Sequence, residues 1–172
     1  YAFMNGSQGT PVTGYTYNLD NTEPLRIGRN TTNVDFKGSL ANIRIVKGTA
    51  VYTSDFTPPT APLTAITNTS LLLNGTNAGI IDKSQTAKTL TLNGDVKSST
   101  TQTKYLSSSM YFDGTGDYIT MDAGASLSPG TGDFTFETWA HLTSYTSGVV
   151  TAFYHLKNDT GTATSVFIVE IT

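Results

Sequence analysis

The chain has 172 residues, of which 37% are hydrophobic and only 13% charged, and its formal net charge is −3 at pH 7. This length suits one ordinary domain or parts of two. The ten Lys and Arg are scattered, so no basic stripe could follow a phosphate backbone and nucleic-acid binding is not expected. No apolar run approaches the ~20 residues of a membrane span. Without cysteine, the chain has neither disulfides nor thiolate metal ligands.

Small hydroxylated residues and glycine take the place of charged ones, with 32 Thr, 15 Ser and 16 Gly. The branched Cβ of Thr favours strands, and Ser and Gly favour the turns between them. A surface kept soluble by hydroxyl groups is common in secreted and virion proteins, so we expect a virion-surface, extracellular or cell-surface location. The chain begins at Tyr1 without Met or a signal-peptide pattern and ends in a strand-like run, so we expect a window cut from a longer polypeptide.

Hydrophobic periodicity predicts strands throughout the chain. Short alternating runs end at Gly, Asn or Asp, and no run of ten or more residues has helical spacing. Asn5-Gly6, Asn93-Gly94 and Asp113-Gly114 mark tight turns. The pattern therefore predicts an all-β fold, either a sandwich or a barrel. Its expected strands are Tyr1–Met4, Thr13–Asn18, Leu25–Gly28, Phe36–Val46, Ser70–Leu73, Thr89–Leu92, Met110–Phe112, Tyr118–Met121, Phe134–Leu142, Val149–His155 and Ser165–Ile171.

Within Phe36–Val46 the apolar spacing changes. A period of two runs as far as Leu40, and the next apolar position on the same face is Ile43, three residues later. Because a step of three breaks the strand period, we expect a β-bulge at Ala41-Asn42. The strand should bend there.

A proline-rich segment separates the two halves of the chain. Three prolines lie within five positions between Phe56 and Thr69, where they remove backbone donors and favour extended, unpaired chain. We therefore expect one unit at residues 1–60, a Pro/Thr-rich linker at 61–69 and a second unit at 70–172.

The motifs of the first half, in their order, resemble the closing portion of a concanavalin A-like, laminin G-like lectin module. They are Tyr1–Gly6, Leu25–Gly28, Phe36–Ile45, Gly48–Tyr52 and Phe56–Pro59. The second half resembles the opening portion of such a module, at Leu71–Asn74, Gly79–Ser84, Ser109–Tyr118 and Gly132–Trp139.

The resemblance implies that the all-β fold is an antiparallel, jelly-roll-like β-sandwich, of the kind that occurs in tandem repeats in phage virion or fibre proteins and bacterial surface proteins. Residues 1–60 would be the C-terminal part of one module, and residues 70–172 the N-terminal part of a second. The alternative is a single circularly permuted sandwich, in which residues 1–60 complete residues 70–172. The two pieces together are about one module long, so the length fits both arrangements.

The resemblance also includes glucanases, yet the acids of this chain do not favour an enzyme. A retaining glycosidase needs two carboxyl groups about 5–5.5 Å apart. Glu23, Glu137 and Glu170 are the only Glu, and none has an acid two residues away. Nucleophilic catalysis lacks both Cys and a Gly-x-Ser-x-Gly elbow. We expect no enzymatic activity.

One face of Phe134–Leu142 carries the candidate ligand-binding residues. Alternation places Phe134, Phe136, Thr138, Ala140 and Leu142 on a core face. Glu137, Trp139 and His141 then share the other face with Thr135. They form a candidate sugar platform, on which the indole would stack against a pyranose ring. The alternative is a structural Trp139 packed inside the sandwich or under a neighbouring loop.

Asp113, Asp117 and Asp122 are candidate calcium ligands. The first two flank the sequence Gly-Thr-Gly, and the third follows shortly after. Ca²⁺ takes six to eight oxygen ligands, and laminin G-like modules often carry it at the sandwich rim. The alternative is an ordinary Asp-Gly turn.

The sequence thus predicts a non-catalytic carbohydrate-binding or adhesion module of a virion fibre or surface protein. Its partners would be glycans, bound weakly at each site and strengthened by a homo-oligomer or repeat array. The alternative is a purely structural or decoration module that mediates subunit assembly. Glycan-array binding lost on loop substitution would separate the first hypothesis from the second.

Overall fold

The computed structural model describes residues 1–10, 24–30, 33–122, 124–144 and 153–155. Within these ranges the chain is all-β, with one short helical turn, α1 (Gly124–Leu127). The predicted strands Thr13–Asn18 and Ser165–Ile171 lie outside the described residues, as do residues 149–152 of a third. The strands are β1 (Phe3–Met4), β2 (Ser7–Gln8), β3 (Leu25–Ile27), β4 (Lys37–Lys47), β5 (Thr69–Thr76), β6 (Gly79–Asp82), β7 (Thr91–Asn93), β8 (Lys97–Ser99), β9 (Ser109–Asp113), β10 (Tyr118–Met121), β11 (Phe134–Leu142) and β12 (Tyr154–His155).

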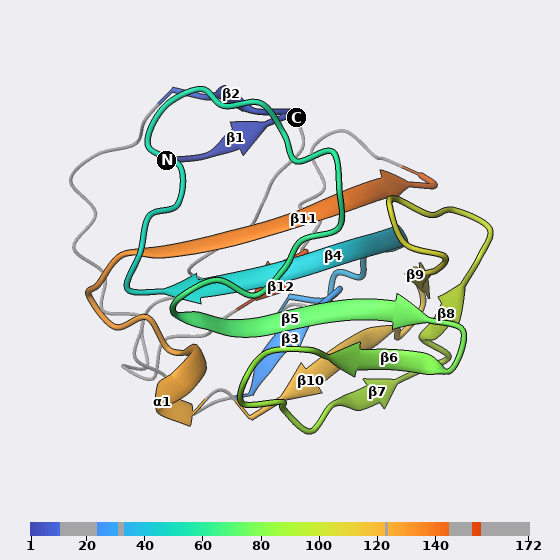
Figure 1. Ribbon diagram of the computed structural model, residues 1–172. Helices are drawn as coiled ribbons and strands as arrows, with labels where there is room; N and C mark the ends of the chain where they lie inside the picture. Colours follow the sequence, from blue (N-terminus) through green and yellow to red (C-terminus); the bar gives the residue numbers. More distant parts are fainter. Residues whose placement is uncertain (11–23, 31–32, 123, 145–152, 156–172) are drawn as a thin grey trace.

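These strands form two larger sheets and one small hairpin (Figure 1). The first sheet, which we call the short-strand sheet, has the order β12-β3-β10-β7. The second, the long-strand sheet, has the order β6-β5-β4-β9-β8, with β11 paired to β4. The hairpin β1-β2 turns at Asn5 and Gly6, whose φ angles of 51° and 84° confirm the predicted tight turn.

Strand β4 organises the long-strand sheet. Along one edge it pairs antiparallel with β11 over nearly its whole length. Along the other edge, its first half pairs with β9 and its second half with β5. Every one of these partners comes from residues after 68, so the described strands join the first and second parts of the chain in one sheet.

The predicted bulge in β4 is confirmed. Glu137 pairs with Arg44, whereas Trp139 pairs with Ala41, so β4 holds one residue more than β11 between these pairs. Asn42 lies there with a φ of 54°, a left-handed conformation that Asn tolerates better than most residues. Its side chain accepts a hydrogen bond from the Leu63 amide and donates one to the Lys104 carbonyl.

The core lies between the two larger sheets, as expected for a sandwich. Buried apolar side chains from both sheets form one cluster, in which Phe36 packs edge-on against Phe112 at 5.6 Å between ring centroids. Phe134, Phe136 and Leu142 pack against this cluster, which confirms the predicted core face of β11 at these positions. Burying each such side chain stabilises the fold by about 1.5–3 kcal/mol. The short-strand sheet contributes Leu25, Ile27, Ile119, Met121 and Tyr154, and the long-strand sheet Leu40, Ile43, Ile45, Leu71, Leu73, Met110 and Phe112.

The segment between β4 and β5 covers part of the outer face of the long-strand sheet, crossing in front of the strands (Figure 1). Arg44 Nη1 donates to the Thr64 carbonyl at 2.8 Å. The Phe56 amide donates to the Gly6 carbonyl of the hairpin turn at 2.9 Å. This cover contributes to the burial of β4, which extends from residue 38 to residue 46.

Strands β2, β6 and β8 were not predicted, because their short sequences lack a clear apolar alternation. Each is paired to a neighbouring strand, β2 to β1 in the hairpin, β6 to β5 and β8 to β9. In the portion of the chain that the structure describes, no helix has the length and apolar character to span a membrane.

Candidate functional site

A hollow on the outer face of the long-strand sheet is the first candidate site. On that face, Ser39 of β4 pairs with His141 of β11 and with Tyr111 of β9, and Ala41 pairs with Trp139. Cross-strand partners place their side chains on the same face. Small side chains on the central strand therefore lie between large ones on its neighbours, and this leaves a depression.

The depression is a pocket of about 160 Å³. Ser39, Ala41 and Ser109, all buried, contribute small side chains to its lining. Trp139 and His141 line it from β11, and the segment Gln102–Lys104 lines it from the loop between β8 and β9. The lining thus combines one indole with hydroxyl, amide, imidazole and ammonium groups.

Trp139 is partly buried and carries two neighbours from the loop. Tyr105 meets the indole edge to face, with ring centroids 5.6 Å apart and an interplanar angle of 79°. Lys104 Nζ lies 4.6 Å from the indole centroid and 4.8 Å from that of Tyr105. The indole therefore lines the pocket, as the sugar-platform interpretation expects, and also contacts a neighbouring loop, as the structural interpretation expects.

Glu137 lies on the same strand face as Trp139 and His141, but its carboxylate is committed elsewhere. Arg44 forms an ion pair with it, 2.5 Å from Nη2 to Oε1, and the Tyr52 hydroxyl donates to Oε2 at 3.0 Å. Burial, followed by the Glu137 charge, raises the pKa of Tyr52, so this hydroxyl keeps its proton as a donor. Of the three candidate ligand residues, Trp139 and His141 line the pocket, and Glu137 anchors the covering segment.

The second candidate site is at the rim where the chain passes between the sheets. The turn at Asp113-Gly114 leads from β9 in the long-strand sheet to β10 in the short-strand sheet, and the turn at Asn93-Gly94 leads from β7 to β8. Gly94 and Gly114 have φ angles of 72° and 86°. The two turns thus connect different sheets, whereas Asn5-Gly6 closes a hairpin within one sheet.

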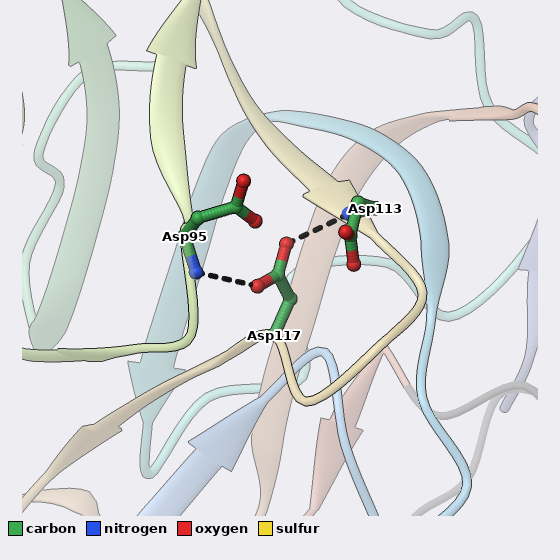
Figure 2. A group of neighbouring side chains, drawn as sticks. All are labelled: Asp95, Asp113 and Asp117. Atoms are coloured by element: carbon green, nitrogen blue, oxygen red, sulfur yellow. Dashed lines mark hydrogen bonds between the residues drawn. The ribbon is translucent and has the colours of Figure 1, made fainter.

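Asp117 joins these two connections (Figure 2). Its fully buried carboxylate accepts a hydrogen bond from the Asp95 amide at 2.8 Å and another from the Asp113 amide at 2.7 Å. Burial raises the pKa of Asp117 and the nearby Asp113 and Asp95 charges add to this, while the two amide donors act in the opposite direction. The carboxylate therefore has a structural role as a clamp between two turns.

The predicted calcium ligands are only partly brought together. Oxygen atoms of Asp113, Asp117 and Asp95 lie within 4.8 Å of one another. Asp122 is exposed beyond the end of β10 and is outside this group. The two amide bonds account for the position of Asp117 without a metal, and Asp113 Oδ1 accepts from the Thr115 amide. Calcium binding stays a prediction, with Asp95 in the place expected for Asp122.

A third connection between the sheets is fastened to the same rim. Asp35, between β3 and β4, accepts a hydrogen bond from the Gly116 amide at 2.8 Å. Its other carboxylate oxygen lies 2.6 Å from Arg29 Nε. Arg29 in turn lies over the Tyr118 ring, 4.9 Å from the centroid. Asp35 therefore has structural partners for both of its carboxylate oxygens.

Lys104, Tyr105 and Asp95 are the contributors that sequence reasoning missed. A Lys-Tyr pair in a long Ser/Thr-rich stretch was the available signal for the first two. Asp95 lies 22 residues from Asp117, and only the tertiary fold brings them together. Comparisons with protein families, with curated proteins and with solved structures found no match for this chain.

Proposed function

We propose that this chain is a non-catalytic carbohydrate-binding module with a jelly-roll-like, concanavalin A-like architecture. The pocket between Trp139, His141 and the Gln102–Lys104 segment is the observation that carries the proposal. It supplies an aromatic surface for the apolar face of a sugar ring. Beside this surface are amide, hydroxyl and imidazole groups that hydrogen-bond to sugar hydroxyls.

The size of the pocket fits a single sugar unit. At about 160 Å³, it is smaller than the roughly 300–1,000 Å³ of pockets that hold drug-sized ligands. One shallow contact of this kind gives weak affinity. Display in several copies, in an oligomer or repeat array on a virion fibre or cell surface, would raise the affinity through avidity.

Glu137 supports the non-catalytic part of the proposal. It is the acid nearest the pocket along β11, and Arg44 and Tyr52 occupy both of its oxygens. The described pocket lining contains no Asp or Glu. A glycosidase would need two carboxyl groups across the bound sugar.

The pairing of β4 supports a single circularly permuted sandwich as the arrangement of the module. This strand lies within residues 1–60, and its partners β5, β9 and β11 come from residues 69–142. The Pro/Thr-rich segment 61–69 would then connect parts of one sandwich.

The carbohydrate hypothesis is tested by a glycan array probed with a multivalent form of the chain. We expect binding to a restricted set of glycans. It should be weakened about tenfold or more in Trp139→Ala and also in His141→Ala, which removes a smaller side chain. Tyr1→Ala is the matched control, since Tyr1 is 68% exposed and lies outside the pocket lining. Equal glycan binding by the native chain and all three variants would reject this pocket as the site.

A purely structural or decoration role is the second candidate. Apolar side chains are exposed on two sheet-edge strands, Ile81 on β6 and Leu92 on β7, and Met4 is exposed on the hairpin. Edge strands and exposed apolar groups are common points of subunit contact. No glycan binding, together with concentration-dependent assembly weakened by Ile81→Lys or Leu92→Lys, would favour this role.

A further inference from the structure

The charge of the pocket distinguishes it from the rest of the chain. Lys104 is the only formally charged residue at neutral pH in the described lining, in a chain whose net charge is −3. Among the described residues, carboxylates pair with Arg29, Arg44 and Lys97. Within the described part of the chain, Lys104 forms no ion pair with a carboxylate. Its ammonium lies over two aromatic rings instead.

The contacts of Lys104 restrict where its charge can lie. The ammonium lies 4.6 Å from the Trp139 centroid and 4.8 Å from the Tyr105 centroid. The Lys104 carbonyl accepts a hydrogen bond from Asn42 Nδ2 at 2.9 Å, which ties the loop backbone to the bulge in β4. Aromatic rings attract a cation without neutralising it. The ammonium thus lies at the pocket wall, and because Lys104 is exposed it remains able to pair with an anion.

Glu137, the acid of β11 on the face of Trp139, does not compensate this charge. Glu137 is two residues from Trp139 on the same face of β11, and its carboxylate is already paired with Arg44. Among the residues described in the lining, Lys104 is therefore the one that carries a formal charge. His141 at the rim adds a further hydrogen-bonding group.

We propose that the pocket selects a sugar unit that carries a carboxylate, which pairs with Lys104 while the ring packs against Trp139. This rests on the proposed carbohydrate-binding function and names the ligand class of that same site. A charge-assisted hydrogen bond from the ammonium is roughly twice as strong as one between neutral groups. Gln102 and Thr103, next to Lys104 in the lining, carry amide and hydroxyl groups that would hydrogen-bond to the ring hydroxyls.

The chain carries its own probe for this interaction. Trp139 is the single tryptophan in the sequence, so all indole fluorescence comes from the pocket wall. The titration uses methyl β-glucuronide against methyl β-glucoside, and sialyllactose against lactose. Methyl β-glucuronide differs from methyl β-glucoside only in carrying a carboxylate at C6, and sialyllactose adds one acidic sugar to lactose. Sodium acetate serves as the anion-only reference.

We expect the acidic sugars to bind about tenfold or more tightly than their neutral partners, with a preference that falls as salt rises. Lys104→Met keeps the apolar stem and should abolish the preference, whereas Lys104→Arg should keep it. Lys97→Met is the matched control, because Lys97 also lies over a tyrosine ring but outside the pocket. The Lys97→Met variant should keep the native preference for acidic over neutral sugars.

The outcomes separate carbohydrate binding by the pocket from its preference for acidic sugars. Equal binding of acidic and neutral sugars, unaffected by Lys104→Met, overturns the acidic preference and leaves carbohydrate binding in place. A response to acetate equal to that of the acidic sugars overturns it too, because the pocket would then be an anion site alone. No response to any sugar in these titrations or on the glycan array rejects both.

Discussion

Arg44 and Glu137 pair across β4 and β11, with Arg44 Nη2 2.5 Å from Glu137 Oε1. Their side chains are only 7% and 15% exposed. Arg44 also donates to the Thr64 carbonyl, and Glu137 also accepts from Tyr52. This pair therefore joins two strands of the long-strand sheet to the segment that crosses over them.

Removing one partner of this pair should cost more than removing both. Glu137→Leu or Arg44→Met alone leaves a largely buried charge without its partner, and buried pairs broken in this way lose about 3–5 kcal/mol. Because the pair retains some solvent contact, we expect about 2–4 kcal/mol for each single variant. The double variant should cost less than either single variant, as measured by urea unfolding. Additive single effects would show that the pair is not coupled.

Tyr52→Phe should destabilise the fold in a pH-dependent way. The variant leaves Glu137 Oε2 without its donor, which should cost about 1–3 kcal/mol at pH 7. Burial and the Glu137 charge raise the folded-state pKa of Tyr52 above its ordinary value of 10.0. Its contribution is therefore complete below pH 10 and is lost as the pH rises through the folded-state pKa.

The measurement for Tyr52 is urea unfolding at several pH values from 7 to about 11. The stability difference between the native chain and Tyr52→Phe should shrink above pH 10. Tyr1→Phe provides the control, since Tyr1 is 68% exposed. A difference that stayed constant over the whole range would contradict the role of the Tyr52 proton.

Regular alternation explains why the longer strands could be predicted. In Phe134–Leu142 and Phe36–Val46 the apolar residues recur with the period of a strand, and both strands lie in the structure within a residue of their expected bounds. The bulge could be predicted because Ile43 follows Leu40 by three residues, whereas side chains on one face of a regular strand recur every two. Strand β8 (Lys97–Ser99) has no apolar side chain and is a strand because β9 pairs with it.

The sites were less predictable, because they depend on contacts between distant parts of the chain. Trp139 and His141 were found because alternation within one strand places them together. Lys104 and Asp95 come from loops whose position depends on the packed sheets. Asp122 was chosen because it is near Asp117 in sequence, yet the chain continues along β10 and carries it away from the rim.

Gly75→Ala should destabilise the contact between β5 and β9. A Cβ at this position would lie 2.7 Å from the Ser109 carbonyl oxygen and 2.8 Å from its carbon. Both are backbone atoms of a neighbouring strand, so relief requires the strands to separate. We expect a loss of about 1–3 kcal/mol, typical of overpacking, by thermal or urea unfolding. Gly9→Ala is the control, because its Cβ would meet nothing closer than 3.7 Å. Equal stability of the two variants would rule out this close approach.

Asp117→Ala should loosen the rim where the chain passes between the sheets. It removes the acceptor for the Asp95 and Asp113 amides. Unpaired donors of this kind cost about 1–3 kcal/mol each when buried, and we expect a total near the lower end of this range because Asp95 is exposed. Asp122→Ala removes an exposed acid outside the Asp95, Asp113 and Asp117 group and should change stability by less than about 0.5 kcal/mol.

The Asp117 comparison is made by urea unfolding with a chelator present, so that bound cations contribute to neither variant. Adding Ca²⁺ to the native chain and to both variants in a parallel series then tests the predicted metal site separately. Similar losses in Asp117→Ala and Asp122→Ala would mean that the buried carboxylate is no clamp. Stabilisation by Ca²⁺ that is lost only in Asp117→Ala would establish this rim as a calcium site.

Separated fragments should test whether residues 1–60 and 70–172 form one sandwich. In the described structure, β4 of the first fragment is buried on both faces, and β5, β9 and β11 of the second are its neighbours. Each fragment alone would expose sheet edges and half of a shared core, so we expect neither to unfold cooperatively. Mixing them should restore the circular dichroism spectrum of the intact chain and a single urea transition, with midpoint rising with concentration. Cooperative folding of 70–172 alone, unchanged by adding 1–60, would instead favour two modules in tandem.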